Sequence, residues 1–469
     1  MFDTIHEECG VFGICDPSGE TDVAHAAYTA LFALQHRGQE SCGIVVNNDG
    51  EISYHRDLGL VPDVFTKEAF DKLGNGQIAV GHTRYSTRSQ AIKANNLPLI
   101  TRHVKGPMAI SFNGSITNAS QLRERHELRG GMFHTTGDTE VIAYTITEQK
   151  LTSNVIEEAI EKAMYKLEGA YSLAIMTTHK LIAVRDPFGY RPLCLGQMPN
   201  GAYVVASESC AFNAIGAEFL RDIMPGEILV IKGKNMKSIT THCGRKPHIC
   251  VFEYVYTARP DSVIEGNSVH RARLRAGEFL WKEHPVDADV VIGVPDSGLD
   301  AALGLSLASG IPYGIGFLKN KYIGRTFILP TQKERENAVR IKLNVIAETV
   351  KDKRVIMVDD SIVRGTTSAN IVELLRKAGA KEVHMRISSP PFMYPCYYGT
   401  DIDSKDKLIA CRMSIEEIRN TIGVDSLGYL SIDAVNHLAD NGKCTFCDGC
   451  FTGKYPSDKD HKCEHCNIK

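Results

Sequence analysis

The amino-acid sequence predicts two units of different fold class, an α+β domain followed by an α/β domain with a parallel sheet. Short strands occur in runs through the first half, interrupted by few helices, whereas strands and helices alternate from about Asp289 onward. Runs of strands with separate helices are typical of an α+β domain with an antiparallel sheet, and alternation is typical of βαβ units. The pattern breaks between Thr240 and Pro247, so we expect domains over residues 9–243 and 244–469.

Hydrophobic periodicity and turn residues predict the individual elements of both halves. Examples of the strands expected in the first half are a short one at 11–14 and others at 52–61, 78–86, 108–116, 172–177, 181–186 and 203–207. The helices expected there are Val23–Gln35, Asp138–Gln149 and Val155–Leu167. In the second half we expect, in order, strand 289–294, helix 299–310, strand 354–360, a loop at 361–368, helix 369–380 and strand 382–390. This alternation predicts one parallel sheet.

The composition is that of an ordinary soluble globular protein. Of the 469 residues, 43% are apolar and 23% are charged, and the net charge is −3 with no long basic block. A nucleic-acid partner is therefore not expected. No apolar run reaches the roughly 18 residues of a membrane span and there is no signal peptide, so we expect a cytoplasmic protein without a membrane partner. Its fourteen cysteines are many for a reducing compartment, where clustered cysteines indicate metal ligands or nucleophiles.

An early cysteine, Cys9, follows a short polar and acidic leader and opens an apolar stretch in MFDTIHEECGVFGIC. Two interpretations are open from these residues alone. In the first, the leader, residues 1–8, is a propeptide whose removal makes Cys9 the N-terminal residue. In the second, Cys9 is a buried structural cysteine in an edge strand.

The stretch VIMVDDSIVRGTTS joins an apolar strand to a helix through two acids and a loop rich in hydroxyl groups. Backbone N–H groups and the helix dipole at such a helix N-terminus favour a phosphate, and the hydroxyl side chains add donors. The paired acids Asp359 and Asp360 cannot bind that phosphate directly, but they can hold ribose hydroxyls or a hard cation such as Mg²⁺. The order of these parts favours a sugar phosphate over the simpler alternative, an acidic turn with a polar helix cap.

The same stretch resembles the signature of the type I phosphoribosyltransferases, which implies a domain of that family and the substrate phosphoribosyl pyrophosphate. The resemblance assigns the 5′-phosphate to Arg364, Gly365, Thr366, Thr367 and Ser368. VPDSG, residues 294–298, matches the family's pyrophosphate loop, where Ser297 joins Asp359 and Asp360 as a contact for Mg²⁺. LKNKYIGRTFILP matches the mobile loop that closes over the site. The substrate contacts that the resemblance offers there and in RIKLN are Lys319, Tyr322, Arg325, Arg340 and Lys342.

Four further stretches follow Cys9 in order: LQHRGQES, GHTRYST, FNGS and TTGDTE. With the early Cys-Gly they resemble the N-terminal-nucleophile (Ntn) glutamine amidotransferases, which implies an αββα hydrolase domain and a self-cleaved propeptide. In that family the thiol attacks the glutamine amide, and the α-amine of the same residue serves as its base. The resemblance implies Cys9 as the nucleophile, Asn113 and Gly114 as the oxyanion hole, and, as glutamine-binding or supporting residues, Arg37, Arg84, Thr87 and Asp138.

Two departures from that family's pattern concern the sheet edge near the glutamine. Ser115 stands where many members carry asparagine, and KANNLPLI lacks the Asn-x-Gln-Pro that many members show. We expect these differences to alter how the edge packs and to leave the thiol chemistry intact.

The C-terminal cysteines give two different predictions for a bound metal. On spacing alone, the C-x-x-C pairs Cys447–Cys450 and Cys463–Cys466 are typical of a zinc ribbon. The flanking sequences instead resemble the iron–sulfur branch of the amidophosphoribosyltransferases, with a cysteine before ARPDS, one after Pro-Pro and a C-x-x-C before FTGKYP. That resemblance implies a 4Fe–4S cluster bound by Cys250, Cys396, Cys447 and Cys450. It gives no role to Cys444, Cys463 and Cys466.

The resemblance spans nearly the whole chain, from Cys9 to Pro456, and implies the activity of the amidophosphoribosyltransferase family. The expected reaction is the glutamine-dependent conversion of phosphoribosyl pyrophosphate to 5-phosphoribosylamine, the first committed step of purine biosynthesis, with ammonia passing from Cys9 to the second site. The family also implies a homotetramer inhibited by purine nucleotides.

Two other functions remain as alternatives. A glutamine-dependent enzyme that aminates a sugar phosphate would have a similar first half, but its second half would lack VDDSIVRGTTS. A purine-sensing regulator that has lost catalysis is the non-enzymatic alternative. The intact set Cys9, Arg84, Asn113 and Asp138 argues against it.

Overall fold

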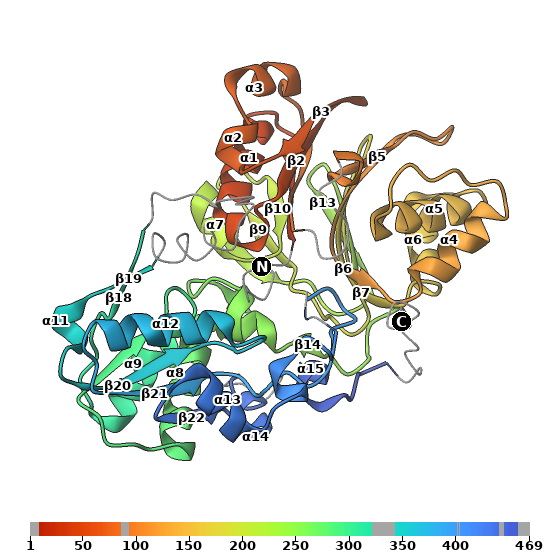
Figure 1. The fold of residues 1–469 in the computed structure, drawn as a ribbon. Coiled ribbons are helices and arrows are strands. Elements are labelled where there is room, and N and C mark those ends of the chain that lie inside the picture. The colour runs from red at the N-terminus through yellow and green to blue at the C-terminus, as the bar shows by residue number, and fades with distance from the viewer. Residues whose placement is uncertain are drawn as a thin grey trace.

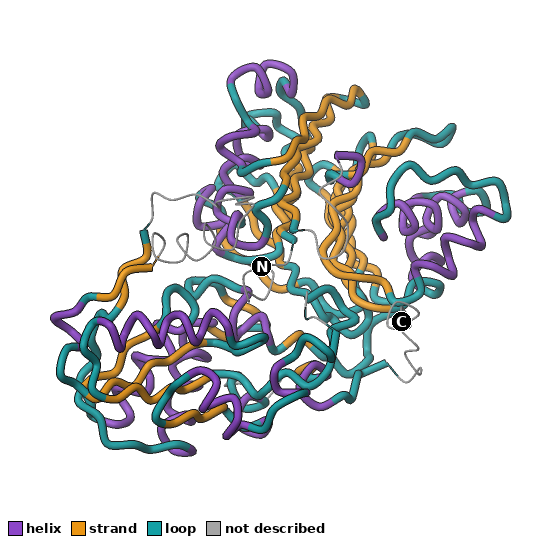
Figure 2. Tube along the Cα trace, viewed as in Figure 1, coloured by secondary structure: helices purple, strands orange, loops and turns teal. Residues whose placement is uncertain are grey.

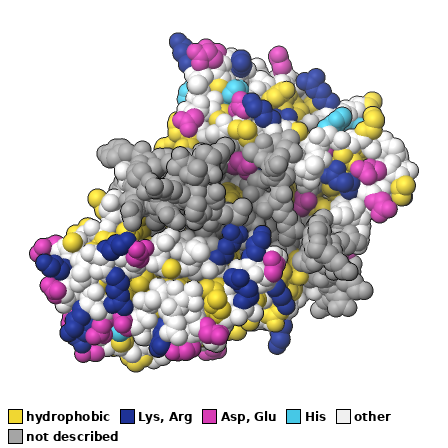
Figure 3. Space-filling view, in the orientation of Figure 1, with side chains coloured by type: hydrophobic (Ala, Val, Ile, Leu, Met, Phe, Trp, Pro, Cys, Tyr) yellow, Lys and Arg dark blue, Asp and Glu magenta, His cyan; other side chains and the backbone are white. Residues whose placement is uncertain are grey.

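Two antiparallel sheets face each other in the first half of the chain, and one parallel sheet forms the centre of the second half (Figure 1). The structure is a computed structural model that describes residues 9–85, 93–320, 343–400, 402, 404–439 and 445–457. No helix among these residues combines the length and the apolar character needed to cross a membrane. On the face in Figure 3, basic and acidic side chains are interspersed, in keeping with the small net charge of −3.

All the strand pairs of the first half are antiparallel. The first sheet has the order β11-β9-β10-β1-β4-β2-β3, with bounds β1 (Gly10–Cys15), β2 (Ser41–Asn48), β3 (Glu51–Leu58), β4 (Ile78–Arg84), β9 (Cys194–Gln197), β10 (Tyr203–Ala206) and β11 (Glu218–Asp222). The second sheet has the order β13-β12-β8-β7-β6-β5, with bounds β5 (Leu99–Thr101), β6 (Met108–Ile116), β7 (Gly169–Thr177), β8 (Leu181–Arg185), β12 (Ile228–Lys232) and β13 (Asn235–Ile239).

Helices cover the outer face of each of these sheets, so the first half has four layers, αββα (Figures 1 and 2). The first sheet packs against α1 (Val23–Ala33), α2 (Val61–Val64), α3 (Lys67–Leu73) and α7 (Cys210–Ile215). The second packs against α4 (Ala119–Glu127), α5 (Asp138–Lys150) and α6 (Ile156–Met164). A separate apolar core, which includes Val11, Val80 and Met176, fills the space between the sheets. Successive side chains of a strand point to opposite faces of its sheet. Because both faces of each sheet are covered, these strands carry apolar side chains on both faces.

The second half contains a four-stranded parallel sheet with the order β17-β20-β21-β22. Its strands are β17 (Val290–Gly293), β20 (Arg354–Asp359), β21 (Glu382–Ile387) and β22 (Ser426–Tyr429). Alternate residues of β20 enter two cores: Ile356 packs with α8 (Val269–Glu283), α9 (Gly298–Ser309) and α14 (Ile432–Val435), whereas Met357 packs with α12 (Thr366–Lys377) and α13 (Ile415–Ile422). A parallel sheet covered on both faces explains why these strands are apolar throughout.

The remaining elements of both halves are short. They are the 3₁₀ turns Gln35–Arg37, Lys93–Asn95 and Ile409–Cys411, the strand pairs β14 (Ile249–Cys250) with β23 (Phe446–Cys447), β15 (Val263–Ile264) with β16 (Asn267–Ser268) and β18 (Phe317–Lys319) with β19 (Leu343–Val345), the π-helix Glu253–Thr257, and the helices α11 (Ala347–Val350) and α15 (Gly449–Thr452). The β14–β23 pair is parallel and brings the C-terminal cysteines to the start of the second half.

The limits of all five predicted helices differ from those in the structure by one to three residues, and several strands were not among those predicted, such as β2, β9, β12 and β22. Helix α1 ends at Ala33 because the chain turns into the 3₁₀ turn at Gln35, whose side chain accepts a hydrogen bond from the Val61 N–H at 2.7 Å. Helix α6 ends at Met164. Helix α12 begins at Thr366, so part of the predicted loop forms its first turn. Strand β22 lacks a strong local signal and exists because β21 offers it a partner.

Candidate functional site

Cys9 lies at the N-terminal end of β1, half-buried beside the end of β4. Its Sγ is 3.8 Å from the carbonyl oxygen of Tyr85, and its own carbonyl accepts a hydrogen bond from Arg37 Nε at 3.2 Å. Because β1 pairs with β4, with Gly10 opposite Thr83, the cysteine comes close to the strand end that carries Arg84. The thiol is therefore at a sheet end where glutamine-binding side chains were predicted.

Arg37 is fully buried behind Cys9 and joins it to two buried carboxylates. Its guanidinium donates to Glu208 at 2.5 Å and, through a two-pronged contact, to Glu253 at 2.9 and 3.0 Å. Burial raises the pKa of Glu208, but His36 and Arg37 outweigh burial and hold that pKa well below its usual range. The side chain thus stays ionised and keeps Arg37 in place, which makes Arg37 a support for the nucleophile.

The predicted oxyanion residues lie side by side on β6. The Nδ2 of Asn113 is buried and has no hydrogen-bond partner among the described residues, so it is a donor that a ligand oxygen could satisfy. Gly114 has φ +136°, and a Cβ there would lie 2.2 Å from the Ala170 carbonyl oxygen, so only glycine fits. The pair is suited to stabilise an oxyanion.

His82 connects the strand of Arg84 to the strand of Asn113. Its Nε2 lies 2.9 Å from the carbonyl oxygen of Phe112, across the space between the two sheets. Burial lowers the pKa of His82 to about 3, so the ring is neutral and Nε2 carries the proton that it donates. This contact fixes the peptide that precedes Asn113, and sequence reasoning did not single it out.

Asp138, the first residue of α5, lies beside the oxyanion strand. Its Oδ2 accepts hydrogen bonds from Ser115 Oγ at 3.2 Å and from the Ile116 N–H at 3.0 Å. Ser115, the departure from the family pattern, is thus bonded to the predicted ammonium-binding carboxylate. The other departure is also tied to the site, because Asn95 bonds to Thr136 at 2.8 and 3.0 Å. Thr87 lies outside the described residues.

Asp359 is the last residue of β20 and Asp360 follows it, and a short loop, residues 361–365, leads from there to the N-terminus of α12. Asp360 accepts hydrogen bonds from the hydroxyls of Ser297 and Ser361. Burial raises the pKa of both carboxyls, and Asp360 adds to the effect on Asp359. The carboxyl edge of a parallel sheet is where such folds bind ligands, and three oxygen-bearing side chains here fit Mg²⁺.

The predicted pyrophosphate loop and the start of the predicted mobile loop contact each other. Lys319, the last residue of β18, forms an ion pair with Asp296, which precedes Ser297. A cation therefore lies next to the loop that was predicted to receive pyrophosphate. The other residues predicted for this loop and for RIKLN lie outside the described residues: Tyr322, Arg325, Arg340 and Lys342.

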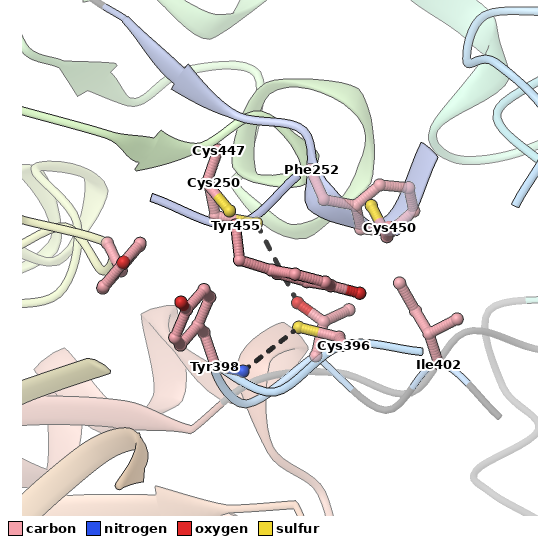
Figure 4. A pocket seen from close by; sticks show the side chains of 10 residues that line it. Cys250, Phe252, Cys396, Tyr398, Ile402, Cys447, Cys450 and Tyr455 are labelled. Carbon is pink, nitrogen blue, oxygen red and sulfur yellow. Dashed lines mark hydrogen bonds between the residues drawn. The ribbon is translucent and has the colours of Figure 1, made fainter. Parts of the chain in front are cut away.

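The cysteines predicted as iron–sulfur ligands line one pocket (Figure 4). They come from four places in the chain: Cys250 on β14, Cys396 in a loop, Cys447 on β23 and Cys450 in α15. The rest of the lining is Tyr190, Phe252, Tyr398, Thr400, Ile402 and Tyr455. Distant segments thus converge on one thiol-rich pocket.

Two of these thiols lie where a free thiolate is strongly disfavoured. Burial, together with the neighbouring thiols, raises the pKa of Cys447 and Cys450 well above the usual range, so these thiolates need a positive partner. Within the described ranges, no three side chains of the metal-binding types lie close enough to hold a single ion. Four cysteines that line one pocket are the type of donor set that a four-iron cluster takes. Cys444, Cys463 and Cys466 lie outside the described residues.

Sequence reasoning missed the buried charged residues that join the two halves. Glu208 accepts from the backbone N–H of Arg259 at 2.9 Å and from Ser262 Oγ at 2.7 Å, both in the second half. Arg191, also fully buried, reaches in the same direction to Tyr398 and Thr400. The available signal was a single charge inside an apolar run, as in ICVFEYVY, but no local pattern names its partner.

Comparison with known proteins gives a consistent set of relatives. Residues 82–214 match the family of glutamine amidotransferase domains. The chain is 46% identical to the amidophosphoribosyltransferase of Methanothermobacter thermautotrophicus over 97% of this chain and 95% of that protein. The corresponding Bacillus subtilis protein is 45% identical over 97% and 95%. A solved structure of glutamine phosphoribosylpyrophosphate amidotransferase from B. subtilis, complexed with ADP and GMP, has a TM-score of 0.90 at 44% identity and covers 98% of this chain and 100% of that one. The predicted fold class is confirmed.

Proposed function

Because the chain belongs to the amidophosphoribosyltransferase family, we propose that its catalytic residues divide the family's reaction between Cys9 and the Asp359–Asp360 pair. The enzyme converts phosphoribosyl pyrophosphate to 5-phosphoribosylamine with nitrogen from glutamine, the first step of purine biosynthesis, and releases glutamate and pyrophosphate. One observation carries the division: a half-buried thiol before β1 and an unsatisfied amide donor on β6 lie in the first half, while a buried acid pair precedes a helix N-terminus in the second.

In the first half, the Cys9 thiol attacks the side-chain amide carbon of glutamine. Its α-amine takes the thiol proton, which requires removal of the propeptide, residues 1–8. Asn113 Nδ2 and the Gly114 N–H bind the oxyanion, and the proton then passes to the departing ammonia. Water hydrolyses the resulting thioester and gives glutamate. The glutamine itself is held by its α-carboxylate at Arg84 and its α-ammonium at Asp138, with support from Arg37 and Thr87.

In the second half, ammonia that has passed through the protein displaces pyrophosphate from C1 of the sugar. The 5′-phosphate lies at the start of α12, where backbone N–H groups and the helix dipole favour it, and its contacts are Arg364, Gly365, Thr366, Thr367 and Ser368. Asp359 and Asp360 hold the ribose side. Bound Mg²⁺, held by these two acids and Ser297, would neutralise charge on the departing pyrophosphate. The remaining contacts proposed for pyrophosphate are Lys319, Tyr322, Arg325 and Lys342.

The proposal includes one 4Fe–4S cluster on Cys250, Cys396, Cys447 and Cys450, which would stabilise the fold by joining distant segments. It also includes a cytoplasmic location, a homotetramer and inhibition by purine nucleotides. The ADP and GMP bound to the B. subtilis relative support the last of these. The proposed domains are 9–243 and 244–469, a division supported by the end of β13 at Ile239 and the start of β14 at Ile249.

The test is an assay of the purified full chain with two nitrogen sources. Glutamine with phosphoribosyl pyrophosphate should give glutamate and pyrophosphate in equal amounts, and ammonium salts should replace glutamine. Glutamine hydrolysis that never yields pyrophosphate would favour the sugar-phosphate aminating enzyme. No turnover with either nitrogen source would favour the purine-sensing regulator.

A further inference from the structure

The loop Cys396–Thr400, which carries one ligand of the four-cysteine pocket, also touches the predicted oxyanion hole in the other half of the chain. A Cβ added at Gly399 would lie 3.1 Å from the Gly114 carbonyl carbon and 3.2 Å from the Gly114 Cα. Gly399 has φ +114°, a conformation that side chains rarely adopt. The two backbones thus meet without any side chain between them, and Gly399 sets how closely they approach.

The same loop reaches the nucleophile through a chain of buried charges. Arg191 donates to the Tyr398 carbonyl oxygen at 2.7 and 3.1 Å and to Thr400 Oγ1 at 3.0 Å. Its Nη1 lies 3.6 Å from Glu253 Oε1. Glu253 is in turn bonded to Arg37, which donates to the carbonyl oxygen of Cys9. Arg37, Arg191 and Glu253 have no exposed surface, so water does not weaken these contacts.

Both ends of this chain of contacts are held firmly. On the pocket side, the Tyr398 N–H points to Cys396 Sγ at 3.4 Å and Thr400 Oγ1 lies 3.9 Å from Cys250 Sγ (Figure 4). The ring of Tyr398 stacks on Tyr190 at 4.1 Å. On the other side, Glu253 begins a π-helix, and buried Arg273 donates hydrogen bonds to two of its carbonyl oxygens, those of Tyr254 at 2.8 Å and Tyr256 at 3.0 Å.

We propose that the Cys396–Thr400 loop positions the glutamine site, with Gly399 acting on the oxyanion strand and Arg191 acting on the nucleophile through Glu253 and Arg37. Both are positioning residues, since neither lies among the groups assigned to touch glutamine. The inference rests on the proposed roles of Cys9 and Gly114. It gives the four-cysteine pocket a purpose in the first reaction, because the pocket fixes the loop that holds the glutamine site in register.

The first test is Gly399→Ala in the full-length protein. The added methyl would push Gly114 or Arg191 by a few tenths of an ångström, so kcat for glutamine hydrolysis should fall about tenfold or more while KM for glutamine changes little. The ammonia-dependent reaction should stay within about twofold of wild type, because the second site is untouched. Gly106→Ala is the matched control, since Gly106 has a similar φ of +101° but its Cβ would meet nothing closer than 3.8 Å.

The second test compares Arg191→Lys with Arg191→Gln. The measured quantity is the rate at which a glutamine-like chloroketone alkylates Cys9, monitored by intact mass. Lysine keeps the charge and should retain part of the wild-type rate, whereas glutamine should reduce it about tenfold or more. Arg221→Gln is the control, because Arg221 also pairs with a buried carboxylate, Glu227, at 2.7 Å, and its other hydrogen bonds are to Asp222 and Ser238.

Thermal unfolding of every variant separates positioning from folding. Equal losses of glutamine-dependent and ammonia-dependent activity, or a Gly399→Ala protein with normal glutamine hydrolysis and normal alkylation, would overturn the proposal. A wild-type protein whose Cys9 is not alkylated at all would instead overturn the proposed function on which it rests. If Arg191 variants fail to fold, Thr400→Val removes one of the Arg191 hydrogen bonds, together with the longer contact between Thr400 and Cys250, and should lower the alkylation rate by a smaller factor.

Discussion

Cys250 and Cys447 lie directly opposite each other on the parallel strands β14 and β23. The Val251 N–H donates to the Cys447 carbonyl oxygen at 3.3 Å, and the Ile249 N–H donates to Thr445 at 3.1 Å. These backbone hydrogen bonds therefore hold the segment that carries the C-terminal cysteines against the start of the second half. A zinc ribbon built within the tail would leave Cys250 without a role, whereas a cluster bound by both segments uses it.

The first prediction separates these two metals. Cys250→Ser should lose the bound metal and lower the midpoint of thermal unfolding, because a metal bound only by the folded state stabilises that state. Cys463→Ser should keep wild-type metal content and stability. Anaerobically purified wild-type protein should be brown and contain about four iron and four sulfide per chain. A single zinc ion per chain that is lost in Cys463→Ser but retained in Cys250→Ser would contradict the cluster.

The second prediction concerns Cys9→Ala. This variant should lose glutamine-dependent activity, retain ammonia-dependent activity and keep the leader, because the thiol is the nucleophile of the first half only. Activity assays and intact mass measure all three outcomes. Cys15→Ala, at the buried end of the same strand, is the control and should retain both activities. A folded Cys9→Ala protein without ammonia-dependent activity would show that the two halves do not divide the reaction, and Met1 on a fully active enzyme would refute the propeptide.

The third prediction concerns the acid pair. Replacing both Asp359 and Asp360 with asparagine should lower the rate with either nitrogen source, since both reactions need the ribose and metal contacts. Charge-assisted contacts contribute roughly 1.5–3 kcal/mol each, so the loss should be at least about tenfold. Steady-state kinetics with ammonia is the direct measurement. Asp433→Asn, at an exposed carboxylate on α14, is the control. Wild-type kinetics in the double variant would rule out this assignment of the phosphoribosyl site.

The fourth prediction concerns the acid stability that His82 controls. Its pKa is lowered from 6.5 to about 3 by burial, so the unfolded chain binds a proton below pH 6.5 that the folded protein does not. Stability from this group is therefore complete above pH 6.5 and falls as the pH drops towards 3, by up to roughly 1.4 kcal/mol per pH unit. In His82→Gln, the free energy of unfolding, measured with denaturant between pH 6.5 and 4, should depend less steeply on pH. The difference should correspond to one proton fewer bound on unfolding.

The fourth prediction has a control in His25→Gln. His25 is exposed at the start of α1 and contacts Asp22 there, so its replacement should leave the steep part of the pH profile in place. An unchanged slope in His82→Gln would mean that the buried ring is not the source of the acid sensitivity. The variant should also hydrolyse glutamine more slowly, because the contact with the Phe112 carbonyl oxygen is altered.

Much of the fold was predictable because its signals are local. The strand at 108–116 was predicted to the residue, since alternating apolar residues mark it without help from the rest of the chain. The order of strand, acid pair and helix around Asp359 was also predicted, because propensity and charge in one short segment specify it. The family and its reaction, inferred from motifs in both halves, are confirmed by relatives over nearly the full length. The individual site residues stay predictions.

The amino-acid sequence by itself determined the family, the fold class and the order of the main elements, and it predicted which residues carry the chemistry. Only the tertiary structure decided how the halves meet: Gly399 on Gly114, Arg37 on Glu253, and Cys250 opposite Cys447. Each of these contacts joins residues far apart in the chain. The sequence around each residue resembles that around any loop glycine, buried charged residue or strand cysteine, so it does not reveal the partner. The physical reason is that periodicity and propensity act over a few residues, whereas such contacts depend on how completed layers pack.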